Sequence, residues 1–211
     1  MDTGPRPDEP LGVQSTAATE DPNGVTPLDP DEAEGLIPTW VATRGALNEA
    51  EQANIGTAVA WLARRTWTPE EVLDVDWLLR LHQRMFSDVW KWAGKTRTTG
   101  KNLGVPVEDI RPQLANLIAD ATFWFSNAGK DPVPDLAAFH HRLVWIHAFA
   151  NGNGRHGRLA TDILARSIGH DAPRWGSEVL DAPSETRAVY IAALRAADNN
   201  DLDPLVVFLR A

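Results

Sequence analysis

Apolar residues recur at helical spacing through almost all of the chain from residue 36 onward, in segments bounded by residues typical of helix caps. Thr68-Pro69-Glu70-Glu71 shows this most clearly, because Thr68 can serve as an N-cap, Pro69 fits the first turn and Glu71 can close a capping box. The periodicity predicts a compact all-α domain. The predicted helices cover residues 47–65, 70–86, 109–126, 134–147, 154–167, 184–197 and 204–210.

One segment, residues 95–107, interrupts the helical pattern with the sequence KTRTTGKNLGVPV. Its repeated Thr, two Gly and one Pro form no helical stripe and favour an irregular β-hairpin or flap between two helices. The residues at the centre of this flap are Thr98, Thr99, Gly100, Lys101 and Asn102. The predicted fold class is therefore all-α with one small β-hairpin flap.

The acidity of the chain is concentrated at its N-terminus. The 211 residues carry a formal net charge of -9, and residues 1–35 hold nine acidic residues against one basic residue. This stretch is also rich in Pro and poor in large apolar residues, so we expect a disordered acidic leader. The nearly neutral body divides into an N-terminal helical segment over residues 36–66 and a core over residues 67–211. An anion site in the body is therefore compatible with the acidic total.

Composition disfavours several classes of protein. The chain has no Cys, which excludes disulfides, thiol catalysis and Cys-ligated metal sites, and which fits a reducing compartment such as the cytoplasm. We see no secretory signal and no apolar run long enough for a membrane span. The nine Trp are mostly not interleaved with Lys and Arg, so we interpret most of them as core residues and expect no direct nucleic-acid binding.

Residues 147–158 read HAFANGNGRHGR and bring several chemical elements together. The run Asn151-Gly152-Asn153-Gly154 predicts a tight loop, because Gly and Asn tolerate a positive φ. A helix that starts directly after such a loop presents backbone N–H groups and the positive end of its dipole, which form an anion site. Arg155 and Arg158, one helical turn apart, can bind phosphate oxygens through forked hydrogen bonds.

His147 stands at the edge of this loop, and its ordinary pKa near 6.5 suits a general base at neutral pH. Alone it would be interpreted as a helix-end histidine favoured by the helix dipole. The adjoining glycines and arginines favour a functional role instead. Of the other histidines, we expect His140 in the core and His141 and His156 at the solvent, where His156 could touch a nucleotide.

The same stretch closely resembles the Fic motif, His-x-Phe-x-(Asp/Glu)-Gly-Asn-Gly-Arg-x-x-Arg. The matching residues are His147, Phe149, Gly152, Asn153, Gly154, Arg155 and Arg158. Residues 89–97, VWKWAGKTR, resemble the family's segment that leads into a flap over the active site. Residues 26–38, 43–45 and 139–144 are more particularly similar to the Fic subfamily called mobile mystery protein B.

The resemblance implies a Fic fold and a nucleotidyltransferase, a protein adenylyltransferase that transfers AMP from ATP to a Ser, Thr or Tyr hydroxyl of a target protein. It gives His147 the role of general base. Phe149 would point inward and lock the loop, and the flap would pin the target segment. ATP is then the donor, with Mg²⁺ or Mn²⁺ as the metal ion. The residues implied to hold the phosphates are Gly152, Asn153, Gly154, Arg155 and Arg158.

One residue departs from the motif, because the acid that holds the metal in the family is Asn151 here. An amide oxygen is a weaker ligand for a hard dication than a carboxylate, so Asn151 would be a minor or water-mediated ligand of a metal held by the nucleotide. An enzyme with this substitution either relies on the metal held by the nucleotide or is expected to be slow. Two alternatives follow. One is a nucleotide-binding interaction protein of a toxin–antidote-like pair, for which the subfamily implies a small helix-turn-helix partner. The other is a Fic enzyme with a different nucleotide donor.

Many Fic proteins also carry an inhibitory helix, (Ser/Thr)-x-x-x-Glu-(Gly/Asn), whose Glu pairs with the second arginine of the motif, here Arg158. The segment that fits its position is residues 47–54. The match is poor, because neither Glu49 nor Glu51 has a hydroxyl residue four positions before it or a Gly or Asn after it. Glu49 and Glu51 are nevertheless the candidate inhibitory residues.

Overall fold

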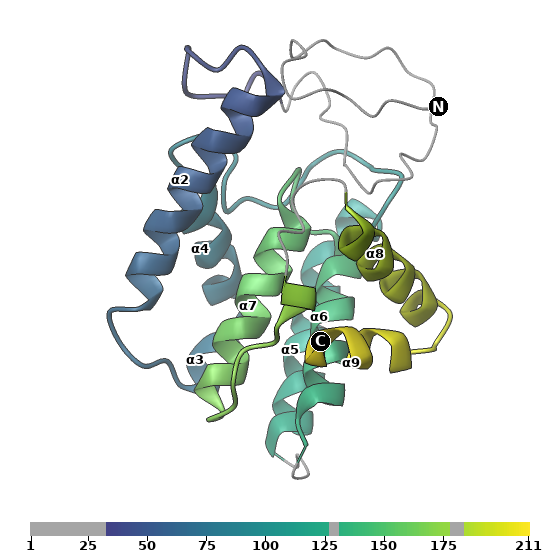
Figure 1. Ribbon diagram of the computed structural model, residues 1–211. Helices are drawn as coiled ribbons and strands as arrows, with labels where there is room; N and C mark the ends of the chain where they lie inside the picture. The colour runs from purple at the N-terminus through teal and green to yellow at the C-terminus, as the bar shows by residue number, and fades with distance from the viewer. Residues whose placement is uncertain (1–32, 127–130, 178–183) are drawn as a thin grey trace.

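The helical periodicity of the sequence corresponds to a bundle of α-helices (Figure 1). The structure is a computed structural model that describes residues 33–126, 131–177 and 184–211, and within these ranges it contains no β-strand. The helices are α2 (Arg44–Leu62), α3 (Pro69–Val72), α4 (Val75–Phe86), α5 (Ile110–Ser126), α6 (Val133–Ile146), α7 (Asn153–Ser167), α8 (Glu185–Asp198) and α9 (Asp203–Arg210), with 3-10 turns at Val107–Asp109 and Trp175–Ser177. The acidic leader predicted over residues 1–35 lies almost entirely outside the described residues.

The single helix predicted over residues 70–86 is wrong, because the chain forms two helices there. α3 ends at Val72, and α4 starts only at Val75. Asp74 lies between them with extended backbone angles, and its carboxylate accepts a 2.7 Å hydrogen bond from the Trp77 backbone N–H. An Asp that caps the following helix in this way competes with helical continuation.

Helix α7 lies at the centre of the bundle and carries the residues of the motif from Asn153 onward. Figure 1 shows it between α2 and α4 on one side and α6 with α8 on the other. α6 and α7 approach closely at Gly157, where an added Cβ would lie 2.8 Å from a methyl carbon of Val144. The start of α7 is therefore placed by packing against α6, whose own end provides His147.

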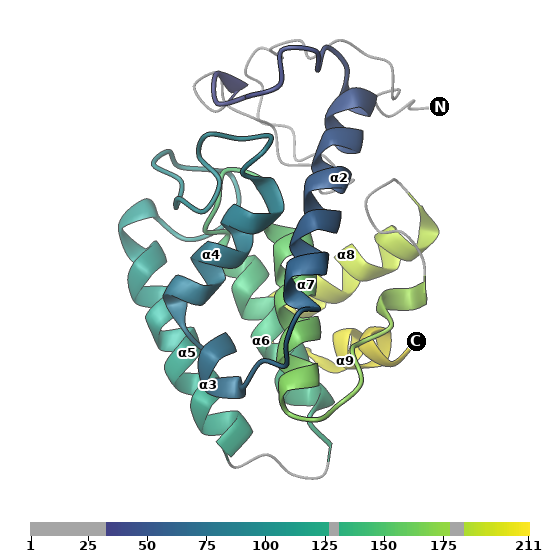
Figure 2. The ribbon, with the colours of Figure 1, turned by 90° about the vertical axis from the view of Figure 1, so that its left-hand side faces the viewer.

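Helix α2 crosses in front of α7 in Figure 2 and packs along α4. Its contact with α4 includes a buried polar side chain, Asn54. The Asn54 amide donates to the Arg84 carbonyl and to the Asp88 carboxylate, both at 3.2 Å, and its oxygen accepts from the Asp88 backbone N–H at 2.9 Å. Hydrogen bonds of fixed direction set the register of α2 more narrowly than apolar contact alone.

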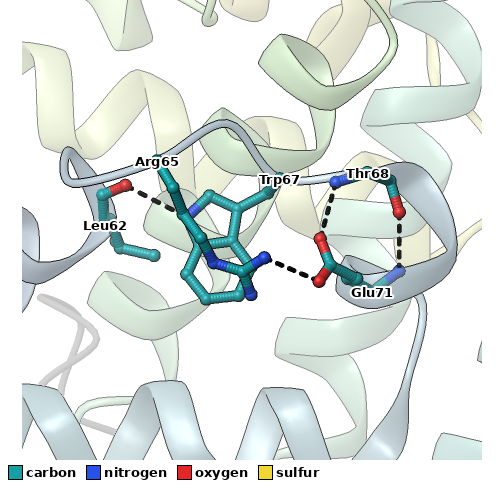
Figure 3. Close-up of polar contacts among 5 residues, drawn as sticks. All are labelled: Leu62, Arg65, Trp67, Thr68 and Glu71. Carbon is teal, nitrogen blue, oxygen red and sulfur yellow. Dashed lines mark hydrogen bonds and ion pairs between the residues drawn. The ribbon is translucent and has the colours of Figure 1, made fainter.

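The end of α2 is fixed to the start of α3 by a compact set of contacts (Figure 3). The Trp67 indole donates to the Leu62 carbonyl at 3.0 Å, and the Arg65 guanidinium lies 3.8 Å from the centre of the Trp67 ring. Arg65 also forms an ion pair of 2.7 Å with Glu71, which closes the predicted capping box with Thr68. Both ends of the connection between α2 and α3 are thus held.

The β-hairpin predicted over residues 95–107 is not formed, and an irregular loop takes its place. The buried guanidinium of Arg97 donates to the carbonyls of Thr99, Val105 and His147. The backbone N–H groups of Arg97 and Val105 donate to the carbonyls of residues 148 and 146, on either side of His147. These polar groups are used by one side chain and by the neighbouring loop, so they do not pair across a hairpin.

No helix of the described part of the chain is both long and apolar enough to cross a membrane.

Replacing the buried Asn54 should destabilise the fold. Asn54→Ala leaves the Asp88 backbone N–H and the Arg84 carbonyl without their partner, which costs about 1–3 kcal/mol of unfolding free energy. Asn48→Ala is the matched control, since Asn48 is exposed on the same helix, and it should change stability by less than about 0.5 kcal/mol. Urea denaturation of both variants measures the difference. Equal stabilities would show that Asn54 does not fix α2.

Candidate functional site

The residues of the predicted site lie on one loop between α6 and α7. α6 ends at Ile146, and His147 follows with the left-handed angles φ 52° and ψ 56°. Gly152, directly before α7, is also left-handed with φ 80°, and an added Cβ there would lie 2.6 Å from the Phe86 ring. Only Gly satisfies both conditions, which explains the glycine at this position. The predicted order of histidine, tight turn and helix start is confirmed.

Asn153 holds the loop together through its side chain. Its amide oxygen accepts from the Phe149 backbone N–H at 2.9 Å, and its amide nitrogen donates to the Phe149 carbonyl at 2.8 Å. The sequence resemblance placed Asn153 among the phosphate ligands, but these two bonds direct its side chain to the loop. Phe149 is buried, as predicted. Asn153 and Phe149 therefore set the shape of the loop from which Gly152 and Gly154 present their backbone.

His82 on α4 supports the same loop, a role that was not predicted. Its ring stacks on Phe149 with 3.7 Å between centroids. The ring nitrogen Nδ1 accepts from the Gly94 backbone N–H at 3.0 Å, so Nε2 carries the proton and donates to the Asn151 carbonyl at 3.0 Å. A lone His on the apolar stripe of α4 has the pattern of an ordinary core residue, so spacing alone could not reveal the role.

The expectation that His156 faces solvent is wrong. It is 1% exposed and forms a 2.9 Å hydrogen bond to the Leu78 carbonyl. His140 is a core histidine, as predicted, and it bonds to the Tyr190 hydroxyl at 2.8 Å. His141 is half-buried, and its Nε2 forms a 2.8 Å hydrogen bond with the Asp198 carboxylate.

His147 is buried beside cationic groups, and both features act on its protonation. Burial, and then the charges of Arg97 and Lys101, lower the pKa of His147 to about 4, while a hydrogen bond to the Val144 backbone opposes this shift. The ring nitrogen that bonds to the Val144 backbone carries the proton, so the other ring nitrogen of His147 has the free lone pair. At neutral pH the ring is uncharged and can accept a proton.

The two arginines of the motif have different partners. Arg155 forms an ion pair with Glu51 on α2, with 2.7 Å between Nη1 and Oε2. Arg158 forms a hydrogen bond with Tyr190 on α8, and its guanidinium carbon lies 5.9 Å from the centre of that ring. Arg155 is thus linked to α2 and Arg158 to α8, although they are one turn apart on α7.

Of the two candidate inhibitory residues, the structure places Glu51 at the motif. Glu51 is 2% exposed, whereas Glu49 faces solvent on α2. The resemblance implied pairing with the second arginine, Arg158. The contact instead involves Arg155, because the inner face of α2 meets α7 at its first turn.

The flap residues Thr98, Thr99, Gly100, Lys101 and Asn102 lie in the irregular loop that follows Arg97. The loop comes close to the motif at Gly104, where an added Cβ would lie 2.5 Å from Cβ of His147. The backbone of Gly104 has a φ of 89°. Gly104 was not predicted as a site residue, and its position in a Gly-containing loop gave only a general sign of a turn. The loop as a whole forms one wall beside His147.

The described residues do not form a metal site of their own. Among the described residues there is no group of three or more His, Cys, Asp or Glu that could hold a metal ion. The Asn151 side-chain oxygen accepts a 2.7 Å hydrogen bond from the Gly152 backbone N–H. The candidate ligand is thus a neutral oxygen that already serves the turn, which does not fit a metal held by the chain.

With this geometry established, comparison with known proteins decides the family. The family model described as Fic/DOC matches residues 72–165, which include the His147 loop and most of α7. This part of the chain is similar to a Fic/DOC domain. The solved Fic-1 structure from Caenorhabditis elegans has a TM-score of 0.61 and 26% identity to this chain, covering 84% of it and 50% of that structure.

Further Fic proteins support the same assignment. The protein adenylyltransferase fic-1 of Caenorhabditis briggsae is 33% identical over 145 residues, which are 65% of this chain and 26% of that protein. The N-terminal Fic domain of a Bartonella quintana Bep effector has a TM-score of 0.66 at 18% identity and covers 85% of this chain and 91% of that chain, which shows the fold alone. The chain spans about a quarter of the length of the curated relatives it matches. The predicted all-α Fic fold is confirmed.

Four buried histidines of the Fic domain should make its stability fall steeply with acid. Burial lowers the pKa of His140 to about 3 and those of His147 and His156 to about 4, and it lowers the pKa of His82 well below its usual value. Near pH 5 the unfolded chain therefore binds about four more protons at these histidines than the folded chain does. Burial raises the pKa of Asp162 to about 6, which offsets one of them.

The unfolding free energy should then fall as pH decreases below about 6.5, by roughly 4 kcal/mol per pH unit near pH 5 for three net protons. Urea denaturation at closely spaced pH values measures this slope. A flat profile between pH 6 and pH 5 would contradict the burial of neutral imidazoles.

Proposed function

We propose that this protein is an adenylyltransferase, transferring AMP from ATP to a Ser, Thr or Tyr hydroxyl of a target protein. The observation that carries the proposal is a neutral His147 beside a glycine turn that opens α7, with Arg155 and Arg158 in the first turns of the helix. A base beside a polyphosphate cradle is the arrangement that this transfer needs. Relatives named protein adenylyltransferase support the choice of reaction.

In the proposed reaction the neutral ring of His147 accepts the proton of the target hydroxyl. The hydroxyl oxygen forms a bond to the α-phosphorus of ATP, and the bond from that phosphorus to the bridging oxygen of pyrophosphate breaks. The backbone N–H of Gly154, with Arg155 and Arg158, stabilises the negative charge that moves onto pyrophosphate, whereas the Gly152 N–H is held by the Asn151 side chain. The irregular loop of residues 98–102 holds the target segment beside His147.

The proposed reaction uses Mg²⁺ or Mn²⁺ only as the ion that accompanies the nucleotide. Because the chain offers Asn151 in place of a carboxylate, the phosphates provide the ligands of such an ion, and we derive no step of the reaction through it.

We further propose that the observed state is inhibited. Arg155 is 18% exposed and pairs with Glu51, a buried carboxylate. In this proposal the carboxylate takes the position on Arg155 that a phosphate oxygen of the nucleotide would occupy. Nucleotide phosphate and Glu51 then compete for the same guanidinium. Glu51 matches the inhibitory motif poorly in sequence, but we propose that it inhibits through this ion pair. Its partner is the first arginine of the motif, Arg155, and not the second, Arg158.

A second function follows from the same contact and from Asn151. With Arg155 occupied and no metal-binding acid, the chain could serve as a nucleotide-binding interaction protein with little turnover. In that proposal it belongs to the mobile mystery protein B subfamily, acts in the cytoplasm, and has a small helix-turn-helix protein as partner. A third proposal, a different nucleotide donor, changes only the base or the group transferred.

His147→Ala should abolish transfer. Incubation with ATP labelled on the α-phosphate, Mg²⁺ and bacterial lysate should label a protein band. Loss of the base should lower that labelling by about 10²–10⁴-fold. His141→Ala is the control and should label normally, because His141 bonds to Asp198 on α8 and not to the His147 loop. Equal labelling by His147→Ala and the wild type would refute the assignment of the base.

Glu51→Ala should raise labelling, because it frees Arg155 for phosphate. Glu49→Ala removes the same side chain from the exposed face of α2 and should have no effect. An increase in both variants, or in neither, would contradict inhibition by Glu51. ATP binding without labelling by Glu51→Ala would favour the second function.

Asn151→Asp should lower the Mg²⁺ concentration needed for half-maximal labelling, since a carboxylate is a stronger ligand for Mg²⁺ than an amide. Asn48→Asp adds the same charge at an exposed position and serves as the control. An unchanged Mg²⁺ dependence in Asn151→Asp would mean that residue 151 does not approach the metal ion.

A further inference from the structure

The Glu51 carboxylate has a second partner besides Arg155. The indole Nε1 of Trp90 donates to Oε1 of Glu51 at 2.7 Å, while Arg155 binds Oε2 at the same distance. Trp90 and Glu51 are each 2% exposed. A carboxylate whose two oxygens have separate partners is held in one orientation, because rotation would break both contacts.

The backbone around Trp90 is itself held by a short N-terminal segment, Gly35–Ile37, which we call the strap. The Ile37 backbone N–H donates to the Val89 carbonyl at 2.8 Å, and the Lys91 N–H donates to the Gly35 carbonyl at 2.9 Å. These bonds lie on both sides of Trp90, and Leu36 stands opposite it in an isolated antiparallel bridge. The strap therefore fixes the backbone from which the indole extends.

We propose that Trp90 and the strap form a latch that keeps Glu51 on Arg155, so that displacement of the strap releases this arginine for the nucleotide. The inference rests on the proposed role of Arg155 as a phosphate ligand and on inhibition by Glu51. Trp90 is a positioning residue in this mechanism, since it acts on the site only through Glu51.

The position of the strap explains why the latch can be opened from outside the site. Gly35–Ile37 directly precedes the turn that leads into α2, and two backbone hydrogen bonds and one bridge attach it to residues 89–91. The side chain of Ile37 is 43% exposed. A partner that engages the chain at or before residue 37 would compete with these few bonds. Strap, indole and carboxylate form one continuous chain of contacts to Arg155.

Trp90→Phe tests the latch, because it removes the indole N–H and retains an aromatic ring against Trp92, whose ring centroid lies 4.9 Å from that of Trp90. Labelling from α-phosphate-labelled ATP should rise by about tenfold, the effect expected for a hydrogen bond to a charged group. Trp77→Phe is the matched control. Trp77 is equally buried, and its Nε1 has no hydrogen-bond partner among the described residues. This control should leave labelling unchanged.

Combining the variants separates the latch from other effects of Trp90. In the Glu51→Ala background, Trp90→Phe should add no further increase, because the carboxylate that it positions is gone. A rise with Glu51→Ala but none with Trp90→Phe overturns the latch and leaves inhibition by Glu51 standing. No rise with Glu51→Ala overturns both.

The strap is tested in the full chain by the indole N–H resonance of Trp90 in ¹H–¹⁵N spectra, with the other eight Trp as internal references. Ile37→Pro removes the donor to Val89 and should shift this resonance in the same direction as Glu51→Ala and raise labelling. Ile37→Ala retains the N–H and should do neither. An unshifted Trp90 resonance in Ile37→Pro, or a shift without increased labelling, overturns the role of the strap.

Discussion

The Glu51 carboxylate lies between the guanidinium of Arg155 and the indole of Trp90, 2.7 Å from each. This one group joins α2, the start of α7 and the segment that leads into the irregular loop beside His147. A buried carboxylate without its partners is costly, so these two contacts favour the observed packing of the three elements. Asn54, one turn further along α2, holds the same helix against α4. The buried polar residues of α2, Glu51 and Asn54, therefore fix the position of this helix beside Arg155.

The loop itself is shaped by neutral groups. The Asn153 side chain forms a hydrogen bond with the Phe149 backbone within the loop. The His82 ring connects the Gly94 backbone N–H to the Asn151 carbonyl. Because burial holds the pKa of His82 well below its usual value, this support is uncharged. The positive charge near the phosphate cradle thus comes from the arginines and from the start of α7. His147 stays neutral for the same physical reason, which makes it available as a base.

Much of the fold could be predicted because its signals are local. The Thr68–Glu71 capping box and the Gly152 turn each depend on a few neighbouring residues, and both are confirmed. The break at Asp74 was missed because the apolar stripe continues across it. The predicted hairpin does not form, because the Arg97 side chain donates hydrogen bonds to carbonyls that a hairpin would pair across its strands.

The site was predictable where its residues are adjacent in the motif, and less so where it is assembled from distant helices. His82 and His156 occupy apolar faces, where a histidine that supports a loop cannot be told from a core residue by spacing. Glu51 was recognised only as one of two candidates, and its partner was misassigned. The choice between Arg155 and Arg158 depends on how α2 crosses α7, which periodicity does not encode.

The central claim is that Glu51 and nucleotide phosphate compete for Arg155. Calorimetric titration of ATP into the wild type, Glu51→Ala and Glu49→Ala tests this most directly, because it measures binding without requiring a target or turnover. Glu51→Ala should bind ATP about tenfold more tightly than the other two, as expected when one charged competitor is removed. Equal affinity in all three proteins would contradict the account.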